Sequence, residues 1–240
     1  MKRLAVLVAI ALAAPQLLSA QYFGRNKVQY QNFDFQILRT EHFDVYYYEQ
    51  ERTAVMDAAR MIERSYARLS RLLDHEFRER KPIILYASHT DFQQTNALSG
   101  FIDEGTGGVT EAYKNRIIMP FTGSYAEFDH VMTHELVHAF QYDVIFRRGI
   151  VNETNPFAER LPLWFMEGMA EYLSIGKIDP HTMSWLRDAT LNGYLRSINE
   201  MNRRDDYLSY RFGQSVWAYI GEKWGDEAVG VLLQKAPRTG

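Results

Sequence analysis

The chain contains no cysteine, and this absence limits both its covalent chemistry and its choice of metal ligands. Without cysteine it can form no disulfide, no thiolate metal site and no lipid anchor on an N-terminal Cys. Any metal ligands must therefore be His, Asp or Glu side chains. A structural zinc site, which commonly uses cysteine, is correspondingly disfavoured.

The sequence also has no segment in which charges of one sign are concentrated. The formal net charge of the 240 residues is −3, and there is no long basic run and no acidic tail. Because proteins that bind nucleic acid carry a basic face, we expect no nucleic-acid partner. With 46% hydrophobic and 24% charged residues, the composition is that of a globular protein with one large domain or two small packed subdomains.

The first 20 residues have the layout of a secretory signal peptide. Lys2 and Arg3 form a basic start, residues 4–14 are apolar, and Ser19 and Ala20 are the small residues of a cleavage site. The apolar run is too short to cross about 30 Å of hydrocarbon, which disfavours a transmembrane helix. A buried N-terminal helix is the other alternative. We expect cleavage after Ala20 and export to the periplasm or the extracellular space, with no membrane span remaining.

Beyond the signal peptide, the hydrophobic pattern changes near residue 125. Predicted strands lie at 42–49, at 82–88 and, as a hairpin after a glycine-rich loop, at 105–121; predicted helices lie at 52–77, 126–146, 163–174, 183–198 and 211–224. We therefore predict an α+β fold. A strand-containing subdomain with a mixed sheet would span 21–125, and a mainly helical subdomain would span 126–240, with the helix at 126–146 between them.

That helix contains HELVH, residues 134–138. His134 and His138 are four residues apart, so both imidazoles lie on one helical face and can reach a single ion at about 2.0–2.1 Å. Glu135 lies about 100° further around the helix, beside the position of a water molecule on that ion, where a general base would be needed. The pattern predicts a catalytic zinc site; the alternative is a buried helix with two hydrogen-bonded histidines.

A third ligand is not supplied by the same helix. His130 is on this face, but it lies about 12 Å from His138 along the axis, too far for one ion, so we expect it to pack or to support a ligand. Residues 161–174, LPLWFMEGMAEYLS, offer Glu167 and Glu171 on one helical face. One can bind the ion while the other accepts a hydrogen bond from a ligand histidine. The spacing does not say which is which.

HELVH followed by WFMEGMAEY resembles the gluzincin metallopeptidases of the peptidase MA superfamily. The resemblance implies a zincin-like fold, one zinc ion and zinc-dependent hydrolysis of peptide bonds in a peptide or protein substrate. It also implies that Glu167 is the third zinc ligand and that Glu171 orients a ligand histidine. Together with the signal peptide, the resemblance implies a location in a bacterial envelope. The 28 residues between His138 and Glu167 exceed the spacing in thermolysin-like and aminopeptidase-like members, which leaves the subfamily open.

Two further stretches are similar to the superfamily, with less specific motifs. SYRFGQSVWAYI resembles a segment whose tyrosine stabilises the tetrahedral intermediate; Tyr210 is the matching residue, with simple packing as the alternative. GTGGVTEAY occupies the place of the edge strand that aligns substrate, or is an ordinary surface hairpin. The chain lacks the Gly-x-Met-Glu-Asn pattern of amine capture, so the resemblance favours an endopeptidase. Sequences of this kind often precede β-propeller repeats, and we expect a continuation beyond Gly240.

Two other functions remain open from the sequence. One is a non-catalytic zinc-binding module of the envelope that binds or assembles partners, although Glu135 would have no use there. The other is hydrolysis of a non-peptide amide or ester, because the chemistry is shared.

Overall fold

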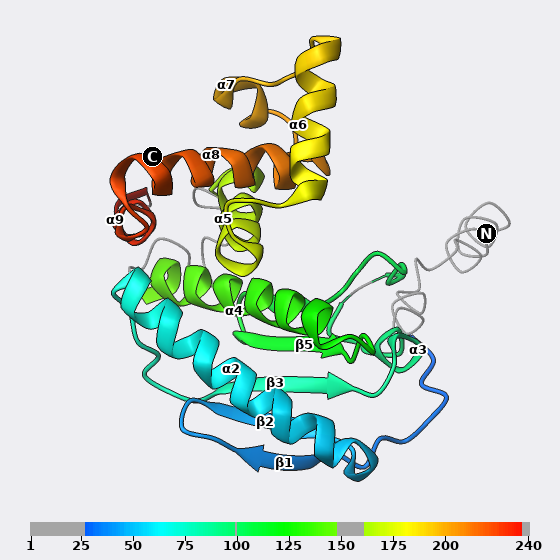
Figure 1. The fold of residues 1–240 in the computed structure, drawn as a ribbon. Coiled ribbons are helices and arrows are strands. Elements are labelled where there is room, and N and C mark those ends of the chain that lie inside the picture. Colours follow the sequence, from blue (N-terminus) through cyan, green and yellow to red (C-terminus); the bar gives the residue numbers. More distant parts are fainter. Residues whose placement is uncertain (1–26, 99, 148–160, 237–240) are drawn as a thin grey trace, which may run out of the picture.

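A computed structural model describes residues 27–98, 100–147 and 161–236 (Figure 1). The expected signal peptide at 1–20 and the C-terminal residue Gly240 lie outside the described residues. No helix within the described ranges is both long and apolar enough to cross a membrane.

The N-terminal half forms a mixed five-stranded sheet in the order β1-β2-β3-β5-β4. The strands are β1 (Gln36–Arg39), β2 (Phe43–Tyr47), β3 (Lys81–Tyr86), β4 (Val109–Glu111) and β5 (Arg116–Pro120). β2, β3 and β5 run parallel, with Val45 opposite Ile83 and Ile84 opposite Ile118. β1 and β4 are antiparallel to their neighbours and form the two edges. The prediction of an α+β fold with a mixed sheet is therefore confirmed for the described residues.

Side-chain alternation explains how the strands pack. Phe43, Val45 and Tyr47 are buried while the residues between them are partly exposed, as the period-two pattern predicts. The same alternation gives the central strands two apolar faces. Ile83 and Leu85 of β3 point to the large core, whereas Ile84 and Tyr86 belong to a smaller cluster on the other face.

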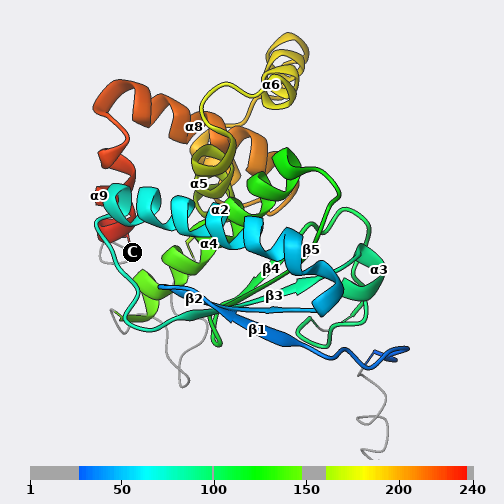
Figure 2. The same ribbon diagram turned by 60° about the horizontal axis from the view of Figure 1, so that its bottom comes forward.

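Two long helices cover the large-core face of the sheet. α2 (Arg52–Leu73) and α4 (Tyr125–Arg147) contact each other and the strands, and both lie along this face in Figure 2. α2 begins where predicted and ends at Leu73 rather than near residue 77, because Asp74 takes a left-handed conformation that turns the chain away. Short helices flank these elements: the 3-10 turn η2 (Glu49–Glu51) and α3 (His89–Phe92).

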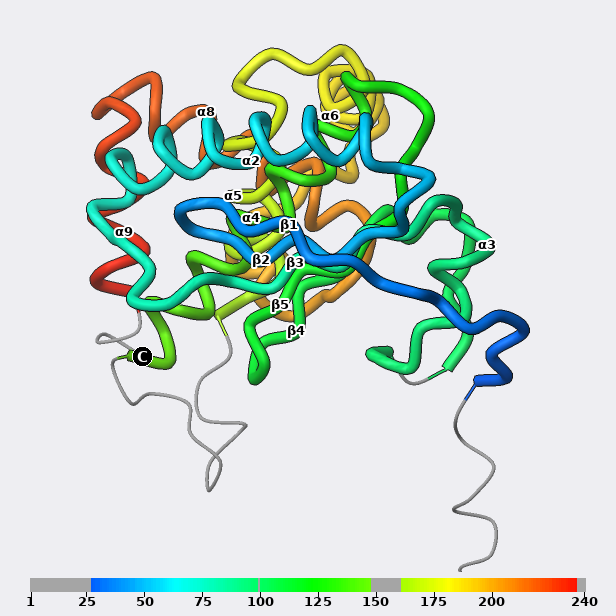
Figure 3. The backbone as a smooth tube through the Cα atoms, turned by 90° about the horizontal axis from the view of Figure 1, so that it is seen from below, coloured from blue at the N-terminus to red at the C-terminus, as the bar shows by residue number. Residues whose placement is uncertain are grey.

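The helical half builds on α4. α5 (Leu163–Ile175) packs between α4 and α8 (Leu208–Trp224), and α6 (Pro180–Asn192) projects beyond α8 on the side away from the sheet (Figure 1). α9 (Glu227–Lys235) returns to lie beside the C-terminal end of α2 (Figure 3). One hydrophobic cluster contains residues of both halves, so the sheet layer and the C-terminal helices share a continuous core.

The predicted helix at 183–198 was wrong in its extent. The structure has α6 at Pro180–Asn192 and a separate short helix, α7 (Ile198–Met201). Asp179 caps the start of α6 through its side chain, and Gly193, with φ of 73°, ends it in a left-handed conformation that glycine adopts readily. The apolar periodicity of the sequence did not reveal that α6 ends at Asn192.

α5 and α8 cross at two glycines that face each other. A Cβ atom on Gly168 would lie 2.3 Å from the carbonyl carbon of Gly213, and one on Gly213 would lie 2.3 Å from the carbonyl oxygen of Trp164. Both distances are far below van der Waals contact, so only glycine permits this approach. The close crossing brings the first turn of α8 to the polar side chains of α5.

Gly213→Ala is therefore expected to destabilise the protein by about 3 kcal/mol or more, because the methyl group must push two packed backbones apart. For a chain of this size the unfolding temperature should fall by roughly 6–12 °C, measured by calorimetry. Gly105→Ala, in a loop where an added Cβ meets only the flexible carboxylate of Asp103, is the matched control. An unfolding temperature for Gly213→Ala equal to that of the control would show that the helices do not approach this closely.

Candidate metal centre

α4 and α5 bring three of the predicted donor residues to one point. His134 and His138 extend from α4, one turn apart, and Glu167 extends from α5. The Nε2 atoms of the two histidines are 3.1 Å apart, and each lies 3.1 Å from Oε2 of Glu167. All three side chains are largely buried.

These separations fit a zinc ion. Three ligand atoms bound to zinc at about 2.0–2.1 Å with tetrahedral angles lie about 3.3 Å from one another, within a few tenths of an ångström of the distances here. Two imidazoles and one carboxylate are also a donor set that zinc hydrolases use while keeping a fourth position for water or substrate. The residues present therefore fit the implied metal.

The hydrogen bonds of the opposite ring nitrogens fix the tautomers that a metal site needs. Nδ1 of His138 lies 2.8 Å from Oε1 of Gln141, whose Nε2 donates to the carbonyl oxygen of Met166 at 2.9 Å. The amide orientation is thereby set, so Nδ1 of His138 must donate, and Nε2 is the nitrogen left to bind a cation. Nδ1 of His134 similarly faces Oε1 of Glu171 at 3.2 Å. Both Nε2 atoms therefore face the carboxylate of Glu167, an arrangement that is favourable only with a cation, either a proton or a metal ion, at this point.

Gln141 was missed in the sequence. It lies three residues after His138 on the same side of α4, and it is completely buried. Its spacing from His138 was the only local signal, and its second partner, the carbonyl of Met166, comes from α5.

Glu171 connects His134 to an ion-pair network of Arg211 and Asp179. Its Oε2 pairs with Nη1 of Arg211 at 3.1 Å, and Arg211 in turn lies 3.7 Å from Asp179. Burial disfavours the charged form of Glu171, but the nearby imidazoles of His130 and His134 and the charge of Arg211 outweigh burial and hold its pKa well below the usual range. Glu171 therefore stays ionised and accepts the Nδ1 proton of His134.

Strong negative potential surrounds the histidines. Burial opposes protonation, yet hydrogen bonds to Glu167 and Glu171 and the charge of Glu135 raise the pKa of His134 to about 10. Glu167 has its pKa lowered below the usual range because the two histidines outweigh its burial. A buried site with this potential favours any cation at Nε2, whether a proton or a metal ion.

His130 defines a second group of possible ligands with His134 and Glu171. Its Nε2 lies 3.6 Å from Oε1 of Glu171, and it is not grouped with His138, in line with the axial distance expected for an unbroken helix. A second ion there would have to share the imidazole of His134 and displace its Nδ1 proton, with the cation Arg211 already against Glu171. The group around His138 and Glu167 is therefore the better metal site.

Glu135 and Tyr210 border the converging donors. Glu135 is buried and is not one of the grouped ligands, but its charge acts on both His134 and His138. The ring of Tyr210, in the first turn of α8, stacks on His134 with centroids 6.4 Å apart. Burial and the charges of Glu167 and Glu135 raise the pKa of Tyr210, so its hydroxyl keeps its proton and can donate.

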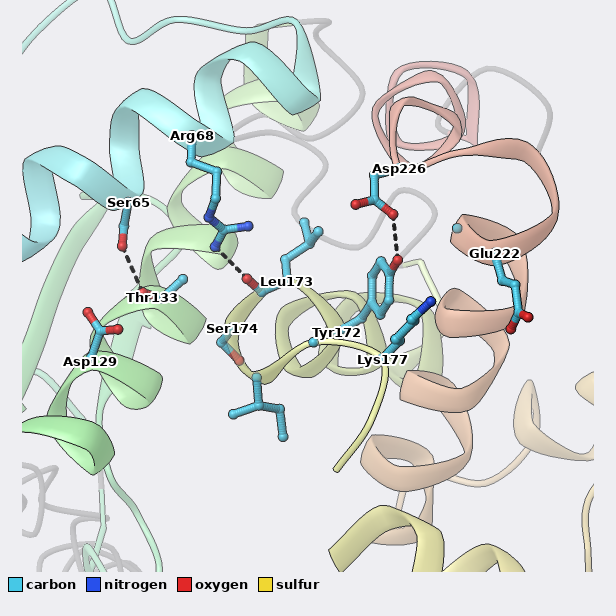
Figure 4. A pocket seen from close by; sticks show the side chains of 13 residues that line it. Ser65, Arg68, Asp129, Thr133, Tyr172, Leu173, Ser174, Lys177, Glu222 and Asp226 are labelled. Carbon is cyan, nitrogen blue, oxygen red and sulfur yellow. Dashed lines mark hydrogen bonds between the residues drawn. The ribbon is translucent and has the colours of Figure 1, made fainter. Parts of the chain in front are cut away.

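A pocket of about 550 Å³ opens at the C-terminal end of α5, and none of the donor residues lines it (Figure 4). Its walls are tied together by hydrogen bonds. Ser65 of α2 pairs with Thr133 of α4 at 3.0 Å, Arg68 donates to the carbonyl of Leu173 at 2.6 Å, and Tyr172 donates to Asp226. These contacts brace α2, α4 and α5 against one another and against Asp226 at the start of α9, and the converging donor residues lie elsewhere.

Comparison with known proteins gives a match to one protein family. A model of one family, described as peptidase of plants and bacteria, matches residues 30–227 and so covers the sheet and the helices from α2 to α8. No curated protein and no solved structure matches the chain. Since the match extends over most of the sequence, the chain belongs to the family of peptidases of plants and bacteria.

Proposed function

We propose that this peptidase is a zinc-dependent endopeptidase with a zincin-like arrangement of sheet and active-site helix. The observation that carries the proposal is the convergence of His134, His138 and Glu167 within 3.1 Å of one another, beside the buried carboxylate of Glu135. In this proposal the three converging residues hold one zinc ion, and Glu171 and Gln141 orient the two histidines.

Zinc, when bound, would supply Lewis acidity that lowers the pKa of water from about 15.7 towards about 7 and polarises the substrate carbonyl. Glu135 accepts a proton from the water that attacks the peptide carbonyl and returns a proton to the leaving amine. The hydroxyl of Tyr210 donates a hydrogen bond to the oxygen that gains negative charge. The raised pKa of Tyr210 suits this role because a donor must keep its proton.

The substrate backbone is proposed to bind along β4. This strand is an edge of the sheet, paired only with β5 among the described strands, and it lies against α4. An extended peptide added to such an edge gains main-chain hydrogen bonds at any point of its sequence, which suits an endopeptidase. The proposed location of the mature chain, after removal of residues 1–20, is the periplasm or the extracellular space of a bacterium.

The test is cleavage of internally quenched peptides by the chain beginning at Gln21. We expect cleavage that stops when a chelator removes the metal and returns when zinc is added. Blocking both termini of the peptides should not prevent it, because an endopeptidase cuts internal bonds. Zinc binding without cleavage of any peptide would contradict the proposal.

Tyr210→Phe is expected to lower kcat by about 10²-fold with little change in KM, because only the transition state needs the lost hydrogen bond. Steady-state kinetics on one cleaved peptide gives both constants. Tyr219→Phe, an exposed tyrosine further along α8, is the matched control. Equal kcat values for the two variants would leave Tyr210 with a packing role only.

A further inference from the structure

One face of β4 lies directly against the proposed general base. Oγ1 of Thr110 lies 2.7 Å from Oε2 of Glu135 and 2.9 Å from its backbone carbonyl oxygen. Both residues are buried. A hydroxyl has one proton to donate, and an ionised carboxylate is a stronger acceptor than a neutral carbonyl. Thr110 therefore donates to Oε2 while Glu135 is charged, and the carbonyl remains a second acceptor within reach.

Gly108 completes this contact from two residues before Thr110, on the same side of the extended chain. A Cβ atom on Gly108 would lie 2.9 Å from Cγ of Glu135, 3.2 Å from its Oε1 and 3.2 Å from Cβ of Met119. Met119 is fully buried in β5, so it cannot move aside easily. Any larger residue at 108 would therefore push the Glu135 side chain out of place.

Together these contacts fix a side chain that is otherwise rotatable. The stem of Glu135 is enclosed by Gly108, and Oε2 is engaged by Thr110, so Oε1 is the carboxylate oxygen that remains to react. We propose that Thr110 and Gly108 are positioning residues for catalysis, and that they assign Oε1 of Glu135 as the atom that accepts the proton of the attacking water. This inference rests on the function proposed above, in which Glu135 is the general base.

The proton transfer balances on these atoms. As the water oxygen forms its bond to the carbonyl carbon, one O–H bond of the water breaks and an O–H bond forms at Oε1. Glu135 is then neutral, and Thr110 can keep its hydrogen bond to Oε2 or turn to the backbone carbonyl at 2.9 Å. When the C–N bond breaks, the proton at Oε1 passes to the leaving nitrogen, and Thr110 again meets a carboxylate.

The first test compares Thr110→Val with Thr110→Ser in the zinc-loaded enzyme. Valine keeps the shape but removes the hydroxyl, so kcat should fall by about 10–100-fold while KM stays within about twofold, because only the placement of the base is lost. Serine keeps the hydroxyl and should recover most of the wild-type kcat. Zinc affinity, measured by competition with a chromophoric chelator, should not change in either variant.

A purely structural role for Thr110 would give a different pattern. Thr95→Val is the matched control, because Thr95 is a buried threonine whose hydroxyl accepts a hydrogen bond from the backbone of Ala97, outside this site. If Thr110→Val lowers the unfolding temperature as Thr95→Val does but keeps wild-type kcat, the inference is overturned.

Gly108→Ala tests the same contact without touching the hydroxyl. It should lower kcat by a similar factor, about 10–100-fold, with zinc still bound, because the methyl group displaces the carboxylate. Gly105→Ala, in the same loop, should retain activity. If Gly108→Ala has the kcat of the wild type, the positioning inference is overturned and the proposed function stands. If the wild-type enzyme cleaves no peptide, the proposed function is overturned as well.

Discussion

Glu135→Gln is expected to abolish peptide cleavage while leaving zinc binding and the fold intact. An amide has nearly the shape of a carboxylate and can still accept the hydrogen bond from Thr110, but it cannot take a proton from water at neutral pH. General-base catalysis typically contributes about 10²–10⁴-fold, so kcat should fall by at least that factor. The measurement is kcat on a quenched peptide, together with the zinc content of the purified variant.

Glu127→Gln is the matched control for this change. Glu127 is an exposed glutamate in the first turn of the same helix, so its substitution makes the same change of charge at a distance from the donors. Its activity should equal that of the wild type. A Glu135→Gln enzyme as active as Glu127→Gln would exclude Glu135 as the base and with it the proposed mechanism.

Glu167→Ala is expected to lose the metal rather than only the reaction. It removes one of the three converging side chains that are proposed to bind the ion, and the only negative charge among them. Loss of a residue that merely orients a ligand costs about 10–100-fold in metal affinity, so loss of a ligand should cost more. Zinc at 1,000 times its dissociation constant should stabilise the wild-type fold by about 4 kcal/mol, and the resulting rise in unfolding temperature should disappear in the variant.

Glu171→Ala provides the comparison, because the two glutamates lie one helical turn apart. It should retain zinc with affinity reduced by about 10–100-fold, since His134 keeps its place in the site but loses the acceptor for its Nδ1 proton. The opposite outcome, with zinc retained by Glu167→Ala and lost by Glu171→Ala, would exchange the roles assigned to the two residues.

Several features of the site could be predicted because they depend on neighbours in the sequence. His134 and His138 share a face of any α-helix, and Glu135 follows from the same geometry. The helix itself was recognisable, and α4 at Tyr125–Arg147 agrees with the predicted 126–146. Local spacing carries this information because an α-helix has a fixed rise and rotation per residue.

Features that depend on distant contacts could not be predicted in the same way. Thr110 and Arg211 reach the site from β4 and α8, and no local pattern distinguishes them from other polar residues. The position of β4 at the sheet edge depends on the strand order. The sequence did not give this order, so it could not decide whether GTGGVTEAY is a substrate-aligning edge strand or an ordinary surface hairpin. The end of α6 at Gly193 was missed because an apolar period continued past it.

The sequence by itself determined which side chains are available to this protein: no thiolates, two histidines and a glutamate together on one helix, and two glutamates on another. It could not determine which glutamate meets the histidines, because Glu167 and Glu171 occupy the same face of α5. The tertiary structure decided this through the crossing of α5 with α4 and α8, where Gly168 and Gly213 allow backbone contact. That crossing places Oε2 of Glu167 at an equal distance from the two Nε2 atoms, and it places Glu171 between His134 and Arg211. Helix packing sets these distances, which periodicity leaves free.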